Sequence, residues 1–531
     1  MPSAPLSPFA GMAIGTWLAR HARRHATRPL LVWAPPDGTI TRWTYASFVD
    51  DVAAIGAALA ARGVRRGDRV LVHLENCPQS LLARFACAWI GAVCVGTNAM
   101  AVGPELAHFA AATGAVGAIT HPKFAAMLAA HCPGLAWLVV TDDDAGVQAE
   151  ARTLPEAADR FSSFRRPPVA PLAADPADAA SIMFTTGTTS RPKAVVWSHA
   201  NVLWGARLNA MQQGLRPDDT ALLFLPLFHV VGLSWCFNAM LWAGGATVLQ
   251  PRFSAGGFWP AAARHGATIG SHVLATLRIM QQQPVPPHRF RRWIYARHDP
   301  AQEAHFGVEL VSGWGMTEVL TQAIVCEPGA DAPAGVIGRP SVGYAVRIVD
   351  EAGRAVPPGG SGALLLGGVR GLSLFKEYDA DPAANDEAFD EHGYFRTGDR
   401  VILREDGWIA FGDRIKDVIK VGGEGVSAAE IESVLARAGF VGEVAVVARP
   451  DDIYGEVPVA FVVLAAAPPD IEACRAHLLA ECAAHLSAFK QPRHIDFIAE
   501  LPRVGFGKIS KVRLREMARD RAQAAPPARS P

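Results

Sequence analysis

The stretch of the chain with the clearest chemical potential is residues 182–199, IMFTTGTTSRPKAVVWSH. A short apolar run ends at Phe184, hydroxylated residues and a glycine follow from Thr185 to Thr189, and Lys193 closes the loop. Backbone N–H groups, hydroxyls and a lysine that follow a strand are the groups that hold a polyphosphate. Because Pro192 and Ala194 flank the lysine, the loop departs from the P-loop pattern, and a kinase or P-loop ATPase is disfavoured. Taken alone, the stretch could also be a Ser/Thr-rich surface turn.

Two further motifs contain residue types that suit nucleotide chemistry. The segment LPLFHVVGL places His229 between apolar residues. His229 could be a functional residue, and the alternative is a histidine packed in the core. The segment SGWGMTE spans residues 312–318. In it, Trp314 could stack on a base, Thr317 could donate to a phosphate, and Glu318 could bind a divalent cation such as magnesium. Alternatively, the same residues would form only a strand, a turn and the start of a helix that is capped by Thr317.

Three charged residues in the C-terminal third could complete a nucleotide site. Asp399, in YFRTGDR, could accept hydrogen bonds from two ribose hydroxyls, and Arg414, in DRIKDVIK, could add a donor to the same sugar or to phosphate. Lys508 follows two glycines in LPRVGFGK. Each of these residues, taken separately, would more often be a solvated surface charge.

The elements that must position these residues alternate between helical spacing and short β-rich runs. Apolar residues recur at helical spacing over residues 16–25 and 45–61, and GDRVLVHL, residues 67–74, indicates a strand. The repeated alternation predicts an α/β fold with layered, largely parallel sheets. Local patterns further predict a helix over residues 233–242, a compact turn over residues 312–318 and a strand over residues 457–464. Residues 336–366 contain short β-rich runs broken by Gly and Pro, which indicate an antiparallel or barrel-like subdomain.

A smaller second domain is predicted near the C-terminus, since 531 residues exceed what one hydrophobic core usually supports. Charged residues, two adjacent glycines and a helix that begins at Ser427 indicate a hinge. We expect a large N-terminal domain over residues 1–413 and a small, mobile α+β domain over residues 414–521. The low-complexity tail, residues 522–531, is expected to be disordered.

The amino-acid composition indicates which classes of molecule the protein binds. Fifty basic residues balance fifty acidic ones, so no net charge favours nucleic acid or an anionic membrane. Eight scattered cysteines form no CxxC pair and no metal-ligand spacing. The longest apolar stretch, Phe85–Gly96, is shorter than the roughly 20 residues that span a bilayer, and no signal peptide is evident. We therefore expect a soluble cytoplasmic protein that binds small molecules and has no integral membrane segment.

The motifs occur in this order over about Thr16–Met517, and together they resemble the adenylate-forming superfamily of acyl-CoA synthetases, firefly-type luciferases and peptide-synthetase adenylation domains. The TTSRPK loop and YARHDP, residues 295–300, are similar to bacterial ligases of the crotonobetaine/carnitine–CoA type. The resemblance implies an ATP- and magnesium-dependent acid–thiol ligase that makes an acyl-CoA through an acyl-adenylate, releasing pyrophosphate and AMP. Its partners would be a small carboxylic acid, ATP and coenzyme A, and it would be a monomer or a homodimer.

The resemblance also implies roles for individual residues. The phosphate loop is matched by Thr185, Thr186, Gly187, Thr188, Thr189 and Lys193. The lining of the adenine and acyl sites is matched by Ser312, Gly313, Trp314, Gly315 and Met316. Thr317 matches a phosphate contact, Glu318 matches the magnesium ligand, and His229 matches the aromatic gate beside the substrate carboxylate. Asp399 and Arg414 match the pair that binds the ribose. Lys508 matches the lysine that bridges the carboxylate and the α-phosphate. Lys416 matches the hinge. The groups that face the site during thioester formation match Lys420, Gly422 and Gly423.

The chain departs from its family at several positions. Ser190 and Ala194 stand where the phosphate loop usually has glycine, and Ala363 and Val504 replace a common acid and a usual threonine. The largest departure is Tyr295–Pro300, which stands in place of the glycine/alanine-rich turn against adenine. The adenine side of the site is therefore less closely matched than the phosphate side.

The segment after His229 bears on the substrate. It offers no acid to pair with a trimethylammonium group, and its apolar side chains predict an uncharged, small-to-medium acyl group. These side chains are Val230, Val231, Leu233, Trp235 and Phe237. Three alternatives remain: a stand-alone adenylation protein that loads a carrier-protein thiol, a catalytically inactive binding homologue, and luciferase-type oxygenation.

Overall fold

The structure is a computed structural model that describes residues 7–147, 158–185, 192–414, 418–421, 424–451, 454–466, 470–486, 488–504 and 508–524. The described chain forms two compact units. The first contains the chain up to Thr185 together with residues 192–345 and 367–394, and the second contains residues 346–366 and the chain from Phe395. The boundary expected between Asp413 and Arg414 stays a prediction.

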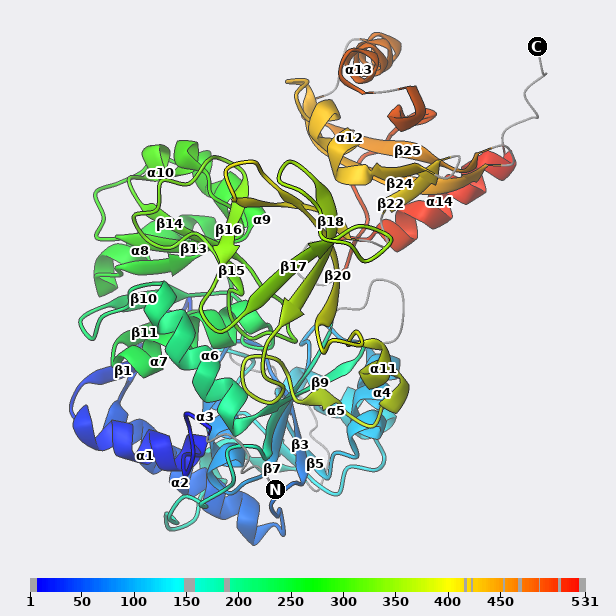
Figure 1. Cartoon of the computed structure of the whole chain (residues 1–531). Helices are drawn as coiled ribbons and strands as arrows, with labels where there is room; N and C mark the ends of the chain where they lie inside the picture. The colour runs from blue at the N-terminus through cyan, green and yellow to red at the C-terminus, as the bar shows by residue number, and fades with distance from the viewer. Residues whose placement is uncertain are drawn as a thin grey trace. The chain divides into compact units, whose positions relative to one another are not determined.

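One sheet of the first unit carries the strands on both sides of the predicted phosphate loop (Figure 1). Its order is β19 (Glu377–Tyr378), β9 (Ala194–Ser198), β8 (Ala179–Phe184), β4 (Val93–Gly96), β3 (Arg69–His73), β5 (Gly117–Thr120), β6 (Leu138–Val140) and β7 (Asp159–Arg160). The pairs from β8 to β7 are parallel, whereas β9 is antiparallel to β8 and β19 is antiparallel to β9. The predicted α/β sheet is confirmed, and its strands β8 and β9 form a hairpin around the loop.

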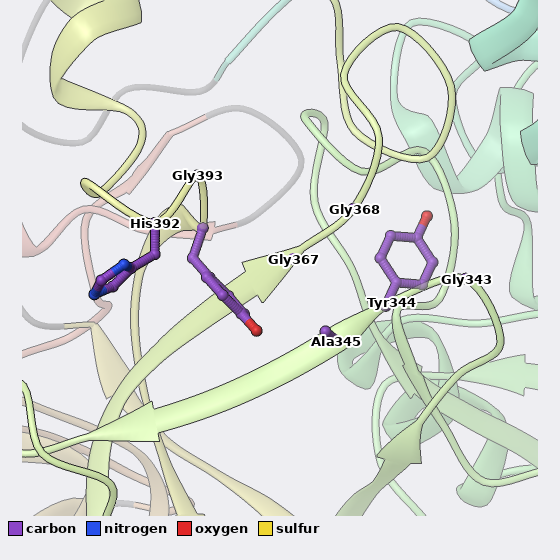
Figure 2. Close-up of a pocket in the computed structure, with 8 residues that line it drawn as sticks. Gly343, Tyr344, Ala345, Gly367, Gly368, His392 and Gly393 are labelled. Carbon is purple, nitrogen blue, oxygen red and sulfur yellow. The ribbon is translucent and has the colours of Figure 1, made fainter. Parts of the chain in front are cut away.

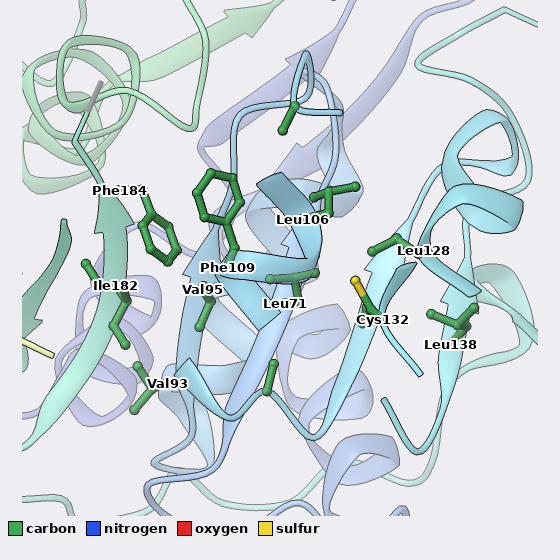
Figure 3. Packing of buried hydrophobic residues seen from close by; sticks show 14 of the residues in the cluster. Leu71, Val93, Val95, Leu106, Phe109, Leu128, Cys132, Leu138, Ile182 and Phe184 are labelled. Atoms are coloured by element: carbon green, nitrogen blue, oxygen red, sulfur yellow. The ribbon is translucent and has the colours of Figure 1, made fainter. Parts of the chain in front are cut away.

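A buried apolar cluster fixes this sheet against the helices α4 (Gly103–Thr113) and α5 (Pro122–His131). Figure 3 shows Phe109 of α4 beside Phe184, the last residue of β8. Their ring centroids are 4.2 Å apart with an interplanar angle of 31°. Because burial of a phenylalanine contributes roughly 1.5–3 kcal/mol, this contact anchors the strand end from which the loop departs.

The second sheet of the first unit is parallel through its centre. Its order is β16 (Val336–Pro340), β15 (Ile324–Val325), β14 (Glu309–Trp314), β13 (Arg292–Tyr295), β12 (Ile269–Ser271), β10 (Thr220–Leu223), β11 (Ala246–Leu249), β1 (Pro29–Trp33) and β2 (Thr41–Thr44). The carboxyl ends of β10, β12, β13 and β14 share one edge, because these strands run parallel. Ligands of open α/β sheets bind outside such an edge.

Two local expectations are corrected in this region. Residues 312–318 were expected to form a compact turn, but β14 continues to Trp314, since Gly313 and Trp314 pair with the antiparallel strand β15. The helix expected over residues 233–242 is present, but it begins at Val231 and consists of the π-helix η2 (Val231–Asn238) followed by α7 (Ala239–Ala243). π-Helical turns are rare and frequently occur at functional sites.

The second unit begins with the strands β17 (Ala345–Val349), β18 (Ser361–Gly367), β20 (Phe395–Leu403) and β21 (Ile409–Arg414) in that order. The pairs β18–β20 and β20–β21 are antiparallel. The antiparallel organisation predicted from the Gly- and Pro-broken runs is therefore confirmed. The hairpin β20–β21 places Asp399 directly opposite Arg414.

The C-terminal sheet is covered on both faces. Its strands are β23 (Glu424–Ser427), β22 (Val418–Val421), β25 (Gly455–Leu464) and β24 (Val441–Asp451), with β26 (His494–Phe497) paired to β25. Val446 packs in one cluster with α12 (Ala428–Leu435) and α13 (Ile471–His485), whereas its neighbour Val447 packs with α14 (Lys511–Ala524). Successive residues of a strand face opposite sides, so α14 lies across the sheet from α12 and α13 (Figure 1).

The remaining main helices are α1 (Ile14–Arg24), α2 (Tyr45–Ala61), α3 (Pro78–Trp89), α6 (His199–Gln212), α8 (Ala255–His265), α9 (Leu274–Gln281), α10 (Pro300–Phe306) and α11 (Pro382–Glu387). A short hairpin, β27 (Arg503–Val504) and β28 (Lys508–Ile509), precedes α14. In the described ranges, no helix combines the length and the apolar character needed to cross a membrane. All eight cysteines are free thiols, and all but Cys474 are buried.

Candidate functional site

The base of the predicted phosphate loop is closed by two hydrogen bonds, each donated by a backbone N–H group. The Thr185 N–H donates to the Lys193 carbonyl and the Lys193 N–H donates to Thr185 Oγ1, each at 3.0 Å. The loop residues Thr186, Gly187, Thr188 and Thr189 lie outside the described residues. The two ends of the loop are thereby held together, and Lys193 immediately precedes β9.

Lys193 and Glu318 contact the same tyrosine side chain. The Lys193 Nζ atom lies 4.6 Å from the centroid of the Tyr378 ring, and the Tyr378 hydroxyl donates to Glu318 Oε1 at 2.9 Å. Tyr378 is 5% exposed and Glu318 is 4% exposed. Burial, followed by the nearby Glu318 carboxylate, raises the pKa of Tyr378 above its ordinary value, so its hydroxyl stays protonated and donates. Two residues predicted to bind the phosphate end of one nucleotide therefore lie together.

The segment after β14 is held from behind by buried side chains. The Trp197 Nε1 atom donates to the Thr317 carbonyl at 2.9 Å, and the Ser234 hydroxyl of η2 donates to the Leu320 carbonyl at 2.8 Å. Leu320 has a φ of 64°, a left-handed conformation that is unusual for leucine. Such strain persists where surrounding contacts determine the backbone, and it clusters at ligand sites. The contacts fix the backbone that carries Thr317 and Glu318.

Gly315 is required by the packing of this segment. A Cβ atom at Gly315 would lie 2.1 Å from the Thr321 carbonyl oxygen and 2.7 Å from the Trp235 ring. We expect Gly315→Ala to lower the free energy of unfolding by about 1–3 kcal/mol, measured by urea denaturation. Gly256 lies in α8, and a Cβ atom there would have no atom within 4 Å. Gly256→Ala should therefore leave the free energy of unfolding unchanged or raise it by up to about 1 kcal/mol. Equal stabilities of the Gly315 variant and the wild type would contradict the packing role.

His229 is half-buried and lies two residues before the start of η2. Its N–H donates to the Pro226 carbonyl at 3.1 Å, and its carbonyl accepts from the Leu233 N–H at 3.0 Å. The preceding turn is held by buried Asn76, whose Oδ1 accepts from the Leu227 N–H at 2.9 Å. The backbone at His229 is therefore fixed by hydrogen bonds on both sides.

The apolar side chains of η2 do not share one surface. Trp235 lies against Gly315, as the separation above shows. Phe237 packs instead against Phe48 and Phe85, with ring centroids 6.4 and 6.0 Å away. Leu233 lines a separate cavity of about 20 Å³. Of these three, Trp235 is the side chain in contact with the 312–318 segment.

The altered turn Tyr295–Pro300 follows β13 at the carboxyl edge of the sheet. Tyr295 and His298 are buried, while Ala296 and Arg297 are exposed. The His298 N–H donates to the Val336 carbonyl at 2.8 Å, which ties the turn to β16. Asp299 caps α10 through its Oδ1, which accepts from the Gln302 N–H at 3.2 Å. The turn therefore presents Arg297 to solvent.

The remaining predicted residues belong to the second unit. Asp399 is 2% exposed and is the Cα partner of Arg414 across β20 and β21. Lys508 begins β28 and is the Cα partner of Val504. Lys420 lies in β22, where it pairs with Gly425. The predicted residues Lys416, Gly422 and Gly423 lie outside the described residues.

The chemistry of Glu318 suits a hard divalent cation such as magnesium, which takes oxygen ligands. Its buried carboxylate is held at one oxygen by the neutral Tyr378 hydroxyl. Across the described ranges, no group of three or more His, Cys, Asp or Glu side chains could hold a metal ion. Glu318 therefore fits a cation that takes its other ligands from phosphate oxygens and water.

A pocket of about 460 Å³ lies apart from these predicted residues. It is lined by Gly343, Tyr344, Ala345, Gly367, Gly368, His392, Gly393 and Tyr394. Figure 2 shows the rings of Tyr344 and His392 on two different sides of it. The Tyr344 hydroxyl lies 2.6 Å from Thr321 Oγ1 and donates to the Ser373 carbonyl at 2.9 Å. This wall of the pocket is therefore bonded to the segment that follows Glu318.

Three supporting residues were missed by sequence reasoning: Asn76, Trp197 and Tyr378. Trp197 follows the phosphate loop within an apolar run, so its position on β9 was a usable signal. Asn76 and Tyr378 carry no local signal, because their partners are distant in sequence.

Comparison with known proteins covers almost the whole chain. The sequence model of the AMP-binding enzyme family matches residues 18–379, and that of the AMP-binding enzyme C-terminal domain matches residues 430–508. A crotonobetaine/carnitine–CoA ligase of Citrobacter koseri is 31% identical over 514 residues, which cover 93% of this chain and 97% of that protein.

Two solved structures extend the comparison. The anthranilate CoA ligase AuaEII in complex with anthranoyl-AMP superposes with a TM-score of 0.84 at 25% identity, covering 97% of this chain and 99% of that one. A benzoate CoA ligase from Burkholderia xenovorans LB400 superposes with a TM-score of 0.82 at 25% identity, covering 95% and 100% of the two chains.

Proposed function

Since the chain belongs to the AMP-binding enzyme family, we propose that it is an AMP-forming acyl-CoA synthetase, which joins a carboxylic acid to coenzyme A with ATP as co-substrate. The observation that carries the proposal is the convergence of Lys193 and Glu318 on one buried tyrosine. A lysine at the end of a loop that suits phosphates, together with a nearby carboxylate that suits a divalent cation, can bind and orient a nucleoside triphosphate.

The first half-reaction activates the acid. A carboxylate oxygen attacks the α-phosphorus of ATP, the bond to the β-phosphate oxygen breaks, and pyrophosphate leaves with the electron pair. Lys193 would bind the leaving phosphates, Thr317 would contact phosphate, and Lys508 would bridge the carboxylate and the α-phosphate. Fixed cationic and N–H groups that face developing negative charge stabilise such a transition state. Magnesium held at Glu318 would supply further charge neutralisation on the phosphates.

The second half-reaction transfers the acyl group. The thiol sulfur of coenzyme A attacks the acyl carbon, the bond to the AMP oxygen breaks, and AMP leaves. Because Lys508 would occupy the space that the thiol needs, we propose that residues 414–521 turn about Lys416 relative to residues 1–413 between the steps. Lys420 would then face the site, and Gly422 and Gly423 would leave room for the pantetheine arm.

We propose an uncharged, small-to-medium acyl group. Trp235 lies against Gly315 and offers an apolar ring rather than a charge. Val230 and Val231 adjoin His229, the proposed gate, and neither is charged. A role in the metabolism of fatty or aryl acids in the cytoplasm, where ATP and coenzyme A are present, follows from this chemistry.

The test is carboxylate-dependent exchange of labelled pyrophosphate into ATP across a panel of acids, with coenzyme A added afterwards. We expect exchange with butyrate-like or aryl acids, and acyl-CoA and AMP after addition of coenzyme A. A much faster exchange with malonate or carnitine would contradict the proposed acyl group. Absence of exchange with every acid would indicate a binding homologue, and AMP release that requires a carrier protein would indicate a loading enzyme.

A further inference from the structure

Tyr378 contacts the proposed magnesium ligand with one end of its side chain and the proposed phosphate-binding lysine with its ring. We propose that Tyr378 is a positioning residue, which orients Glu318 toward the metal and Lys193 toward the phosphates of the metal–ATP complex. The inference rests on the proposed function, because that function assigns the roles of Glu318 and Lys193.

Tyr378 is itself firmly held. Its N–H donates to Asn385 Oδ1 at 2.8 Å, and its carbonyl accepts from Asn385 Nδ2 at 2.9 Å. Its ring packs on Phe375 with centroids 4.6 Å apart. Strand β19 pairs Tyr378 with Val195, two residues after Lys193. A side chain fixed at its backbone and ring can fix the direction of its hydroxyl.

The hydroxyl suits the orientation of a metal ligand. It is a neutral donor, so it restrains Glu318 Oε1 without a positive charge that would compete with the cation. A carboxylate has about four acceptor sites on its two oxygens, so the one hydrogen bond from Tyr378 does not prevent Glu318 from binding a metal. Hydrogen bonds from residues behind a metal ligand orient it, and loss of such a bond typically weakens metal affinity about 10–100-fold.

The ring suits the lysine. A cation over an aromatic face is attracted to the ring but keeps its full charge and its N–H donors. An ion pair with a carboxylate would instead neutralise the charge that the phosphates need. Tyr378 thus holds Lys193 in place while leaving it able to bind phosphate.

The test separates the hydroxyl from the ring. Tyr378→Phe removes the hydroxyl and keeps the ring, and Tyr378→Leu removes both. Binding of ATP is measured by calorimetry with and without Mg²⁺, and binding of Mn²⁺ to the ATP-loaded protein is measured by electron paramagnetic resonance. For Tyr378→Phe we expect about tenfold weaker Mn²⁺ binding and unchanged affinity for metal-free ATP. For Tyr378→Leu we expect weaker binding of metal-free ATP as well.

Two controls distinguish positioning from packing. Tyr344→Phe removes another hydrogen-bonded tyrosine hydroxyl, which contacts Thr321 after the same segment, and it should leave Mn²⁺ binding unchanged. In a Glu318→Gln background, Tyr378→Phe should cause no further loss of Mn²⁺ binding, because the two residues act through one another. Unchanged Mn²⁺ binding in Tyr378→Phe with a lower melting temperature would overturn the proposal. The binding measurements need no acid substrate, so they remain decisive even if pyrophosphate exchange fails for every acid.

Discussion

Replacing Lys508 by alanine is expected to lower carboxylate-dependent pyrophosphate exchange about 10²–10³-fold while leaving thioester formation from a preformed acyl-adenylate nearly unchanged. The reason is that Lys508 would stabilise negative charge on the carboxylate and the α-phosphate only during adenylation, and removal of one such group typically costs this much. Exchange of labelled pyrophosphate measures the first half-reaction, and release of AMP from a synthetic acyl-adenylate with coenzyme A measures the second.

Lys490→Ala is the matched control for the loss of a lysine in the C-terminal unit. Lys490 forms an ion pair with Glu430 at 2.8 Å, and surface pairs of this kind contribute about 0–1 kcal/mol. Both half-reactions of this variant should therefore stay within about threefold of the wild type. Equal losses of both half-reactions in Lys508→Ala would contradict the role given to Lys508 and would indicate damage to the whole domain.

The elements that were predicted correctly are those whose sequence pattern is local. The apolar run at residues 67–74 became β3, and the run at 457–464 lies within β25, because each strand is buried among its neighbours. The start of the segment 312–318 was misread as a turn because the strand conformation of Gly313 and Trp314 depends on pairing with β15. The π-helix at η2 was missed because its apolar residues fit ordinary helical spacing equally well.

The same distinction applies to the candidate site. Thr185, Lys193 and Glu318 stand in recognisable motifs, so their types and spacing made them candidates from the sequence. Tyr378 stands in EYDADP, where nothing local indicates that its hydroxyl bonds to Glu318. Residues that position others are defined by contacts between segments far apart in the chain, and a single sequence does not contain that information.

Asp399→Asn is expected to raise the KM for ATP about 10–100-fold with little change in the KM for the acid. Asp399 is buried and lies opposite Arg414, where we propose that its carboxylate accepts hydrogen bonds from both ribose hydroxyls. Asparagine has nearly the same shape but only one acceptor oxygen, so one bond to a charged group is lost, which is worth about 1.5–3 kcal/mol. Initial rates of pyrophosphate exchange at varied ATP measure the effect.

A comparison of ATP with 2′-deoxy-ATP makes this prediction specific to the ribose. The wild type should favour ATP about tenfold or more, and Asp399→Asn should lose most of that preference, because one of the two acceptors is gone. Asp406→Asn is the matched control, since Asp406 is a partly exposed acid on the same hairpin that pairs with Arg404 at 3.0 Å. If Asp399→Asn kept the full preference for ATP while its KM rose, the carboxylate would act on the fold of the hairpin and not on the sugar.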